Sequence, residues 1–411
     1  MKKNINQILD KESNIEIYFL AWLLVLSFLL RLAVVYFVRD THFDNEWNTL
    51  LDNLIKYKSY SFYTFNEQLI PSVFAPPMYP FFLYFVKVIT SFDKVSLLYA
   101  IIFIQIIFST YSVYLFYQIN QNFFSNKLSL INSAVFSIVP LNVIVGGQIS
   151  SASLQIIFSL LFLKFLFLIT NKQTKKNIFI FSIVSGLLIL TRGEFLLIFS
   201  FIIFFTFLNK KITLVNIIKI VIVVILIISP YVVRNYIHFN EMIIVKSLGY
   251  NLWKGNNQLS PVEGYENLEA VEFVKLKNKV NNLEKNKYYE ISRDNIFLNE
   301  AVSNLRKNSL QYIKLYFKKF ISYYFIDINS SYQNYYILFH TFPIVLLSLL
   351  SFPGLFVFYK INKFETNCLG LYMFSNLIIF SIFFILPRYK LTILPIQIIL
   401  AAYFIIYLLK K

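Results

Sequence analysis

A succession of apolar runs constrains the fold of this chain more than any other feature. A helix of about 20 apolar residues is needed to cross the hydrocarbon core of a bilayer. With 57% hydrophobic and only 14% charged residues, the 411-residue chain has the composition of a polytopic membrane protein. We predict an all-α fold with about ten transmembrane helices, at 17–38, 96–118, 128–146, 152–170, 178–191, 194–208, 212–230, 335–359, 367–386 and 391–409.

The distribution of lysine in the short connections predicts the orientation of these helices. If the runs alternate as given, one side of the membrane carries Lys2, Lys3, Lys11, Lys127, Lys172, Lys175, Lys176, Lys210, Lys211, Lys360, Lys363, Lys410 and Lys411. The opposite short loops hold only Arg192, Arg388 and Lys390. By the positive-inside rule both termini are cytoplasmic. The net charge of +17 therefore indicates topology and contact with anionic membrane lipids, and we expect no nucleic acid partner.

Two long polar segments, 39–95 and 231–334, then face outward and divide the chain into three parts. These parts are an N-terminal transmembrane module at 1–230 containing the first outer loop, an outer polar segment at 231–334, and C-terminal transmembrane helices at 335–411. Met78–Phe92 is apolar but short, follows two prolines and contains Lys87, so we expect an amphipathic helix lying flat at the outer interface.

Helical spacing of apolar residues predicts two further interfacial or outer helices in the larger segment. The first covers Ser292–Asn308, with Ser292 as its N-cap. The second covers Tyr312–Ile326, where aromatic residues alternate with lysines such as Lys319 in a pattern typical of a helix on anionic headgroups.

Carboxylates at the start of the first outer loop are the candidates for proton transfer. Asp44 and Glu46 lie a few residues beyond the first apolar run, where partial desolvation raises a carboxylate pKa toward the range useful for deprotonating a hydroxyl. The alternative is an ordinary loop in which Asp44 caps a helix. His42 beside them leaves a divalent metal as a second alternative, although isolated histidines near an interface are more often structural.

Basic residues on the same side complement these carboxylates. They are Arg192 in TRGEF, Arg234 in SPYVVRNY, and Arg388 and Lys390 around Tyr389 in PRYK. Each by itself is explained as an interfacial anchor. Together they favour a site for phosphate or pyrophosphate, since converging cations bind phosphate through charge-assisted hydrogen bonds. Arg31, inside the first run, is expected to extend outward to the interface.

The order of several short motifs resembles bacterial integral-membrane glycosyltransferases of the GT-C superfamily, in the branch of protein O-mannosyltransferases and lipid A aminoarabinose transferases. The motifs that carry the resemblance are DNEW at 44–47, PPMYP at 76–80, SPYVVRNY at 229–236, GYNLWKGNN at 249–257 and PRYKLTILP at 387–395.

The resemblance implies sugar transfer from a polyprenyl-phosphate donor at the outer face of the bacterial cytoplasmic (inner) membrane, in biosynthesis of lipopolysaccharide or another cell-envelope glycan. It implies Asp44 as catalytic base and contacts with the lipid phosphate from Arg234, Arg388, Tyr389 and Lys390. We add Glu46 as a second catalytic residue and Arg192 and Tyr79 as substrate contacts to the predicted site. One motif departs from the pattern. The outward turn after the third run reads GGQISSASL and has no carboxylate, for which Glu46 or Glu194 are substitutes.

The reaction expected from these residues is an inverting displacement at the anomeric carbon that requires no cofactor. The acceptor is a lipid, a glycan or a protein. Two other functions fit a polytopic chain with a basic outer face, namely a flippase or transporter of lipid-linked glycans and a glycan polymerase. Transporters usually carry midplane sites and internal repeats, whereas the polar residues here gather in the outer loops.

Overall fold

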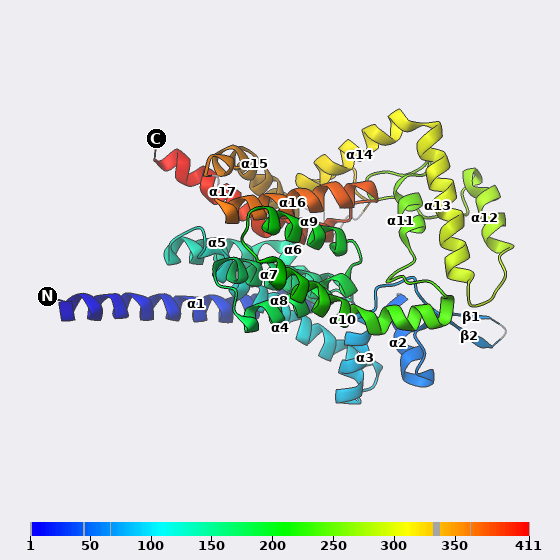
Figure 1. Cartoon of the computed structure of the whole chain (residues 1–411), viewed down its shortest axis with the longest axis horizontal. Coiled ribbons are helices and arrows are strands. Elements are labelled where there is room, and N and C mark those ends of the chain that lie inside the picture. The colour runs from blue at the N-terminus through cyan, green and yellow to red at the C-terminus, as the bar shows by residue number, and fades with distance from the viewer. Residues whose placement is uncertain (1, 44–45, 66, 332–337, 362, 411) are drawn as a thin grey trace.

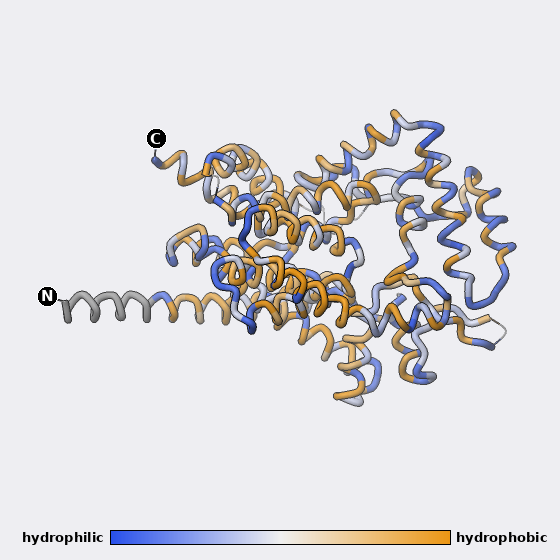
Figure 2. Tube along the Cα trace, viewed as in Figure 1, coloured by the Kyte–Doolittle hydropathy of each residue, from blue (hydrophilic) through white to orange (hydrophobic). Residues whose placement is uncertain are grey.

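Apolar helices form the body of the molecule, and a more polar part covers one end of this body (Figures 1 and 2). The computed structural model describes residues 2–43, 46–65, 67–331, 338–361 and 363–410. The body contains α1 (Lys2–Val38), α4 (Lys94–Asn120), α5 (Asn126–Ile138), α6 (Pro140–Ile144), η1 (Val145–Gly147), α7 (Ala152–Asn171), α8 (Lys175–Thr191), α9 (Phe195–Leu208), α10 (Leu214–Phe239), α15 (Leu338–Ile361), α16 (Phe364–Ile382) and α17 (Leu394–Leu409).

The all-α membrane fold is confirmed, and each of the ten predicted runs coincides with helical structure. Five helices, α1, α4, α7, α10 and α15, are long and apolar enough to cross a bilayer. A sixth span results if α5 and the α6–η1 segment, which meet at 65°, are counted as one bent span. Because α9 and α17 have only 14 and 16 residues, the number ten stays a prediction.

The helices of the body pack around a continuous apolar core. α7 packs against α4 and α8, α8 against α10, and α15 against α17. α7 is buried on most of its surface, whereas α10 exposes a broad apolar face that only lipid would cover in a membrane.

Arg31 is the charged residue deepest in this body, and the expectation that it extends outward is wrong. Its side chain is fully buried. Nε donates to Ser109 Oγ at 2.7 Å, and Nη1 donates to Ser27 Oγ at 2.5 Å and to Ser137 O at 3.1 Å. Polar groups of α1, α4 and the end of α5 therefore replace water around Nε and Nη1, whereas Nη2 is buried without a hydrogen-bond partner among the described residues.

The polar part is built from the first outer loop, the segment after α10 and a short connection before α17. In Figure 1 it lies at the end of the body opposite to both termini. Its elements are α2 (Glu46–Tyr57), β1 (Ser61–Phe65), β2 (Gln68–Pro71), α3 (Met78–Thr90), α11 (Leu248–Gly255), η2 (Val271–Phe273), α12 (Val274–Asn281), α13 (Tyr289–Lys307), α14 (Ser309–Tyr324) and η4 (Pro387–Thr392).

The predicted helices of this part exist, and their details differ in three ways. α13 begins at Tyr289, so Ser292 lies inside its first turn and is not the N-cap. Lys319 on α14 is buried in protein and does not face headgroups. α10 continues through Pro230 to Phe239, so the predicted boundary at 230 falls inside a helix, and the boundary at 334 lies outside the described residues.

A β-hairpin in the first outer loop was not predicted. β1 and β2 pair in antiparallel register, with Thr64 opposite Leu69 and Phe65 opposite Gln68. A five-residue and a four-residue strand give too few alternations for periodicity to stand out beside long apolar runs. α3 is amphipathic as expected, burying Tyr79 and Leu83 and exposing Phe85, while its place at a membrane interface stays a prediction.

Candidate functional site

The first outer loop begins the candidate site, because α2 starts at Glu46. This helix has one apolar face, with Leu50, Leu51 and Leu54 buried, and its opposite face carries polar residues. Glu46 therefore lies at the exposed N-terminal end of a helix that is held by its apolar side. Asp44 lies outside the described residues, so its predicted roles as base or helix cap stay predictions.

Tyr79 supports this helix end from below. The Trp47 ring packs edge-on against the Tyr79 ring at 5.1 Å. The Tyr79 hydroxyl donates to Gln105 Oε1 at 2.9 Å, and Gln105 Nε2 donates to Gln148 O at 3.0 Å. Since Tyr79 is only 1% exposed, the structure gives it a supporting place beneath the loop and not the open place expected of a substrate contact.

Asp40 supplies the carboxylate that the GGQISSASL turn lacks. Ile149 N donates to Asp40 Oδ2 at 2.6 Å, and Asp40 N donates to Gly147 O at 2.9 Å. The end of α1 is thereby tied to the turn after α6, next to Tyr79. Among the described residues no hydrogen bond joins this turn to Glu46 or Glu194, the two substitutes expected from the sequence.

Glu46 lies among charges from two other parts of the chain. Its carboxylate is reached by solvent, yet surrounding protein desolvates it and raises its pKa. Arg388 and Lys254 lower the pKa of Glu46 through their positive charges, and Glu266 raises it. The first outer loop, the outer segment and the connection before α17 therefore meet around this carboxylate.

Arg192, Arg388 and Tyr389, which we call the Arg–Tyr cluster, provide the cationic side of the site. The Arg192 guanidinium lies over the Tyr389 ring at 4.2 Å and over Phe380 at 5.2 Å. Nη1 of Arg192 is buried and has no hydrogen-bond partner among the described residues. The half-buried Arg388 guanidinium likewise makes no hydrogen bond to a described residue. Both arginines thus keep donor capacity for an anionic ligand.

Lys390 does not join this cluster, and the expectation that all four cations converge is wrong for it. Its ammonium is buried and donates to Tyr324 O at 2.5 Å, to Phe325 O, and to Ser348 Oγ at 3.2 Å. In the η4 turn Lys390 points to the end of α14, whereas the neighbouring Tyr389 faces Arg192. Lys390 therefore joins α14 to α15.

Arg234 is also engaged elsewhere. Nη1 donates to Ser72 O at 2.6 Å and Nη2 donates to Tyr60 O at 3.0 Å. On the other side of the same strand end, the buried Glu290 of α13 accepts hydrogen bonds from Val73 N at 2.6 Å and Phe74 N at 2.9 Å. Arg234 and Glu290 together hold the hairpin of the first outer loop, and we call this pair the hairpin clamp.

The outer segment reaches the site through α11. Gly255 at the end of α11 approaches the chain before η4 so closely that an added Cβ would lie 1.9 Å from Phe383 O. The buried Lys319 Nζ donates to Gly255 O at 2.8 Å and to Asn256 Oδ1 at 3.0 Å. Asn256 in turn donates to Ile382 O at 2.8 Å. These contacts fix Lys254 beside the Arg–Tyr cluster.

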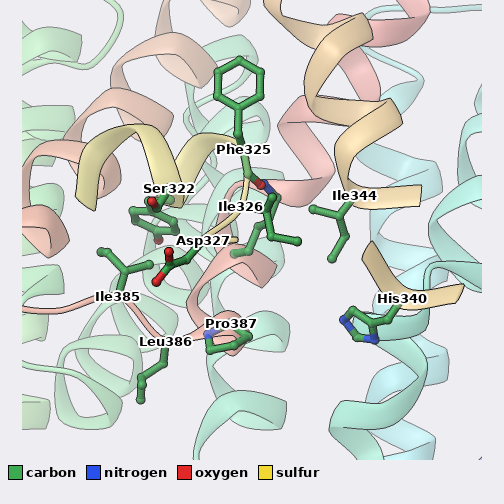
Figure 3. Close-up of a pocket in the computed structure, with 11 residues that line it drawn as sticks. Ser322, Phe325, Ile326, Asp327, His340, Ile344, Ile385, Leu386 and Pro387 are labelled. Carbon is green, nitrogen blue, oxygen red and sulfur yellow. The ribbon is translucent and has the colours of Figure 1, made fainter. Parts of the chain in front are cut away.

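No group of three or more histidine, cysteine, aspartate or glutamate residues comes together to hold a metal within the described ranges. A small cavity of about 30 Å³ lies on the other side of the η4 connection, between Asp327, His340 and Pro387 (Figure 3). It has room for about two water molecules and is too small for a sugar ring.

Of the residues identified from the sequence, Glu46 lies within reach of the charge of Arg388, and Arg192 stacks on Tyr389, the neighbour of Arg388 in the chain. Sequence reasoning missed Asp40, Lys254, Glu266 and Glu290. Lys254 is part of the GYNLWKGNN motif, whose presence was the available signal. The other three are single acidic residues in polar stretches, and only their tertiary contacts distinguish them.

Comparison with known proteins gives one family and a set of solved structures. The family model for dolichyl-phosphate-mannose-protein mannosyltransferase matches residues 75–233. No curated protein sequence matches the chain significantly.

Solved structures of AglB share the fold of this chain at low sequence identity. The oligosaccharyltransferase AglB from Archaeoglobus fulgidus, in complex with an inhibitory peptide and a dolichol-phosphate, has 14% identity and a TM-score of 0.56 over 96% of this chain and 51% of AglB. The same enzyme tethered to an acceptor peptide has 15% identity and a TM-score of 0.57, and the match covers 96% of this chain and 50% of the enzyme's chain. The chain thus spans about half the length of this enzyme. ArnT from Cupriavidus metallidurans bound to undecaprenyl phosphate matches with 10% identity and a TM-score of 0.41, over 93% and 77% of the two chains.

Proposed function

We propose that the chain is a membrane glycosyltransferase of the GT-C type that transfers a sugar from a polyprenyl-phosphate donor to a lipid, glycan or protein acceptor at the outer face of the cytoplasmic membrane. The family model over residues 75–233 and the fold shared with AglB support this proposal. The observation that carries this proposal is the meeting of Glu46 with the Arg–Tyr cluster. A displacement requires an acceptor base and a group that stabilises the phosphate leaving group. Glu46 near Arg388, and an Arg192 Nη1 without a hydrogen-bond partner among the described residues, supply these two functions.

In the proposed reaction the acceptor hydroxyl oxygen attacks the anomeric carbon of the donor sugar. The bond between that carbon and the phosphate oxygen breaks, and its electron pair leaves with the polyprenyl phosphate. A carboxylate of the first outer loop, Asp44 in our proposal, takes the acceptor proton. Attack opposite to the leaving group inverts the anomeric configuration. The proton, the sugar and the charge are then all accounted for without a cofactor.

The Arg–Tyr cluster stabilises the leaving group. The unpartnered Nη1 of Arg192 and the guanidinium of Arg388 donate to phosphate oxygens as negative charge develops on them. Tyr389 holds the Arg192 plane from below, 4.2 Å away. We assign Lys390 and Arg234 to holding the fold around the site, since each already donates to two backbone carbonyls of other segments.

Glu46 is proposed to act beside Asp44, either by taking the proton itself or by holding the acceptor. Its raised pKa brings it closer to the range in which a carboxylate accepts a proton efficiently near neutral pH. The positive charge of Arg388 opposes this effect and favours the ionised form, which the base needs before transfer.

The test is transfer of radiolabelled sugar from a panel of polyprenyl-phosphate sugars to membrane acceptors. We test Asp44→Asn and Glu46→Gln separately. The variant that removes the base should lower transfer by at least about a hundredfold, as expected for the loss of general-base catalysis. Asp52→Asn is the matched control, because Asp52 lies on the same helix with only an exposed ion pair to Lys94.

For the cations, Arg388→Met is compared with Arg306→Met, which removes an exposed arginine at the end of α13. Transfer lost in the first variant and kept in the second supports the proposal. If the wild-type protein consumes no donor while labelled lipid crosses the membrane, the transferase proposal is wrong and the flippase hypothesis replaces it.

A further inference from the structure

A charged group on the outer segment borders the candidate site and has no role in the reaction described so far. It consists of Tyr250 and Lys254 of α11 and Glu266 of the following loop. Resting on the proposed function, we propose that these three side chains bind hydroxyl groups of the sugar being transferred and so determine which donor sugar the enzyme accepts.

Tyr250 and Lys254 both contact the same carboxylate oxygen of Glu266. Lys254 Nζ lies 2.5 Å from Glu266 Oε2, and the Tyr250 hydroxyl donates to the same oxygen at 2.8 Å. The other oxygen, Oε1, has no hydrogen-bond partner among the described residues, and the Glu266 side chain is 56% exposed. The carboxylate is thus fixed in orientation while keeping one oxygen open to solvent, where it can accept hydrogen bonds from a ligand.

An aromatic surface lies directly beneath the group. Lys254 Nζ is 4.8 Å from the centre of the Phe384 ring, and the Phe384 ring is 6.1 Å from the Tyr389 ring. Tyr389 is the residue on which Arg192 stacks. A continuous path of contacts therefore joins Glu266 to the Arg–Tyr cluster that we assign to the donor phosphate.

The same group faces the acid side of the site. Lys254 and Glu266 both act on the Glu46 carboxylate through their charges, and Glu46 acts on Tyr250. During displacement the anomeric carbon lies between the acceptor oxygen, next to the base, and the phosphate. Side chains that border both the base and the phosphate cluster accordingly lie beside the sugar ring and not beside the acceptor or the lipid chain.

The chemistry of the group suits a polyhydroxyl ligand. A carboxylate only accepts and an ammonium only donates hydrogen bonds, so together they match a hydroxyl that both donates and accepts, or two adjacent hydroxyls. A phosphate would be repelled by Glu266, which distinguishes this group from the Arg–Tyr cluster. Discrimination by such a site is large, since an analogue lacking the hydroxyl leaves a charged partner unpaired.

An ion pair that only holds the outer segment together is the competing explanation, and the chain contains such a pair for comparison. Lys277 contacts Glu269 in the same outer segment, with side chains 36% and 71% exposed. No aromatic contact of Lys277 and no charge effect on Glu46 links that pair to the site in the described chain. Glu269→Gln is therefore the matched control for Glu266→Gln.

The experiment measures kcat and KM for polyprenyl-phosphate hexoses and for their monodeoxy counterparts at each ring position. For the wild-type protein we expect a kcat/KM ratio of about tenfold to a hundredfold in favour of the full hexose at one or two positions. In Glu266→Gln that ratio falls toward one, mainly through a higher KM for the full hexose, whereas Glu269→Gln keeps it. Tyr250→Phe, which removes only a hydroxyl, lowers the ratio in the same positions.

The outcomes separate the two proposals. If the wild type transfers sugar and both Glu266→Gln and Tyr250→Phe keep its discrimination among deoxy sugars, the assignment of this group is wrong and the proposed function stands. If the wild type transfers from no donor, the proposed function is wrong. Should Glu266→Gln fail to fold, as judged by its thermal unfolding, Tyr250→Phe decides the assignment alone.

Discussion

Removing the carboxylate of Glu290 should release the hairpin of the first outer loop. Glu290 lies on α13 with 3% of its surface exposed. It accepts three hydrogen bonds, from Ser72 Oγ at 2.8 Å, Val73 N at 2.6 Å and Phe74 N at 2.9 Å. The two backbone donors belong to the chain directly after β2, so Glu290 takes the place of a neighbouring strand for these amides.

The expected loss follows from the number of donors left without a partner. In Glu290→Ala the amide of the fully buried Val73 loses its acceptor, and the Phe74 amide keeps only a long hydrogen bond to Ser72 Oγ, at 3.4 Å. An unsatisfied buried donor costs about 1–3 kcal/mol, so two cost about 2–6 kcal/mol of unfolding free energy. Glu290→Gln keeps a carbonyl oxygen with two lone pairs, which can accept from both amides as Oε2 does in the wild type, so we expect a smaller loss than in Glu290→Ala. Against a typical total of about 5–15 kcal/mol, the loss in Glu290→Ala is large.

The assay combines chemical unfolding of the detergent-solubilised protein with hydrogen exchange of the amides at 73 and 74. Glu284→Ala is the control, because Glu284 is an exposed acidic residue of the same segment whose carboxylate accepts a hydrogen bond from Asn286, two residues away. We expect faster exchange and lower stability in Glu290→Ala and no change in the control. A Glu290→Ala protein within about 0.5 kcal/mol of the wild type, with unchanged exchange, would refute the reasoning, since that is the range of neutral surface changes.

The pH dependence gives an independent check on Glu290. Burial raises its pKa above the ordinary value, and the hydrogen bonds from Val73, Ser72 and Phe74 only partly oppose this. A folded state with a raised carboxylate pKa binds the proton more tightly than the unfolded chain does. Stability therefore falls as the pH rises from about 4.3, the ordinary glutamate value, through the folded pKa. Glu290→Gln should remove this part of the pH dependence.

Three further predictions concern the docking of α11 and the charge of the site. Gly255→Ala should lower the unfolding free energy by about 1–3 kcal/mol and should also lower transfer, because the added Cβ would lie 1.9 Å from Phe383 O. Gly370→Ala is the control: an added Cβ there meets no atom within 4 Å, so this variant should be neutral in the same unfolding and transfer assays. Burial lowers the pKa of Lys319 to about 7, so the unfolding free energy should rise by about 5 kcal/mol between pH 7 and 10.5. An unfolding free energy of the wild type that does not change with pH, or one that changes equally in Lys319→Met, would contradict this. Arg388→Met removes a positive charge that lowers the pKa of Glu46, so the pH below which the residual transfer activity declines should become higher. A decline that begins at a lower pH would contradict the assignment of Glu46 as the titrating group.

The predicted helices and the observed ones agree where the signal is local. Backbone groups in an apolar environment must be satisfied within the segment, so each apolar run coincides with helical structure, although the run 128–146 is broken into α5 and the α6–η1 segment. The amphipathic helix α3 was also found. The number of full spans could not be fixed in the same way. α9 and α17 are shorter than the hydrocarbon core is thick, and only their neighbours determine how they are accommodated.

Side-chain direction was beyond the reach of sequence reasoning even within one motif. Tyr389 and Lys390 are adjacent in PRYK, yet Tyr389 stacks under Arg192 while Lys390 points to the carbonyls at the end of α14. The η4 turn rotates successive residues by about a third of a turn, so neighbours in sequence face different partners. Nothing in the four letters distinguishes the cation that is used by the fold from the one left for a ligand.

The sequence by itself determined the membrane class, the helical runs, the two polar segments and the residue types that a lipid-phosphate transferase requires, because these depend on hydropathy and on chemistry carried by each residue. The tertiary structure alone decided which charges share one region. Asp40 at the GGQISSASL turn, Glu290 at the hairpin and Lys254 with Glu266 beside Glu46 are each brought into contact across long stretches of chain. Electrostatic and hydrogen-bond energies depend on distances between atoms, and those distances exist only once the helices have packed.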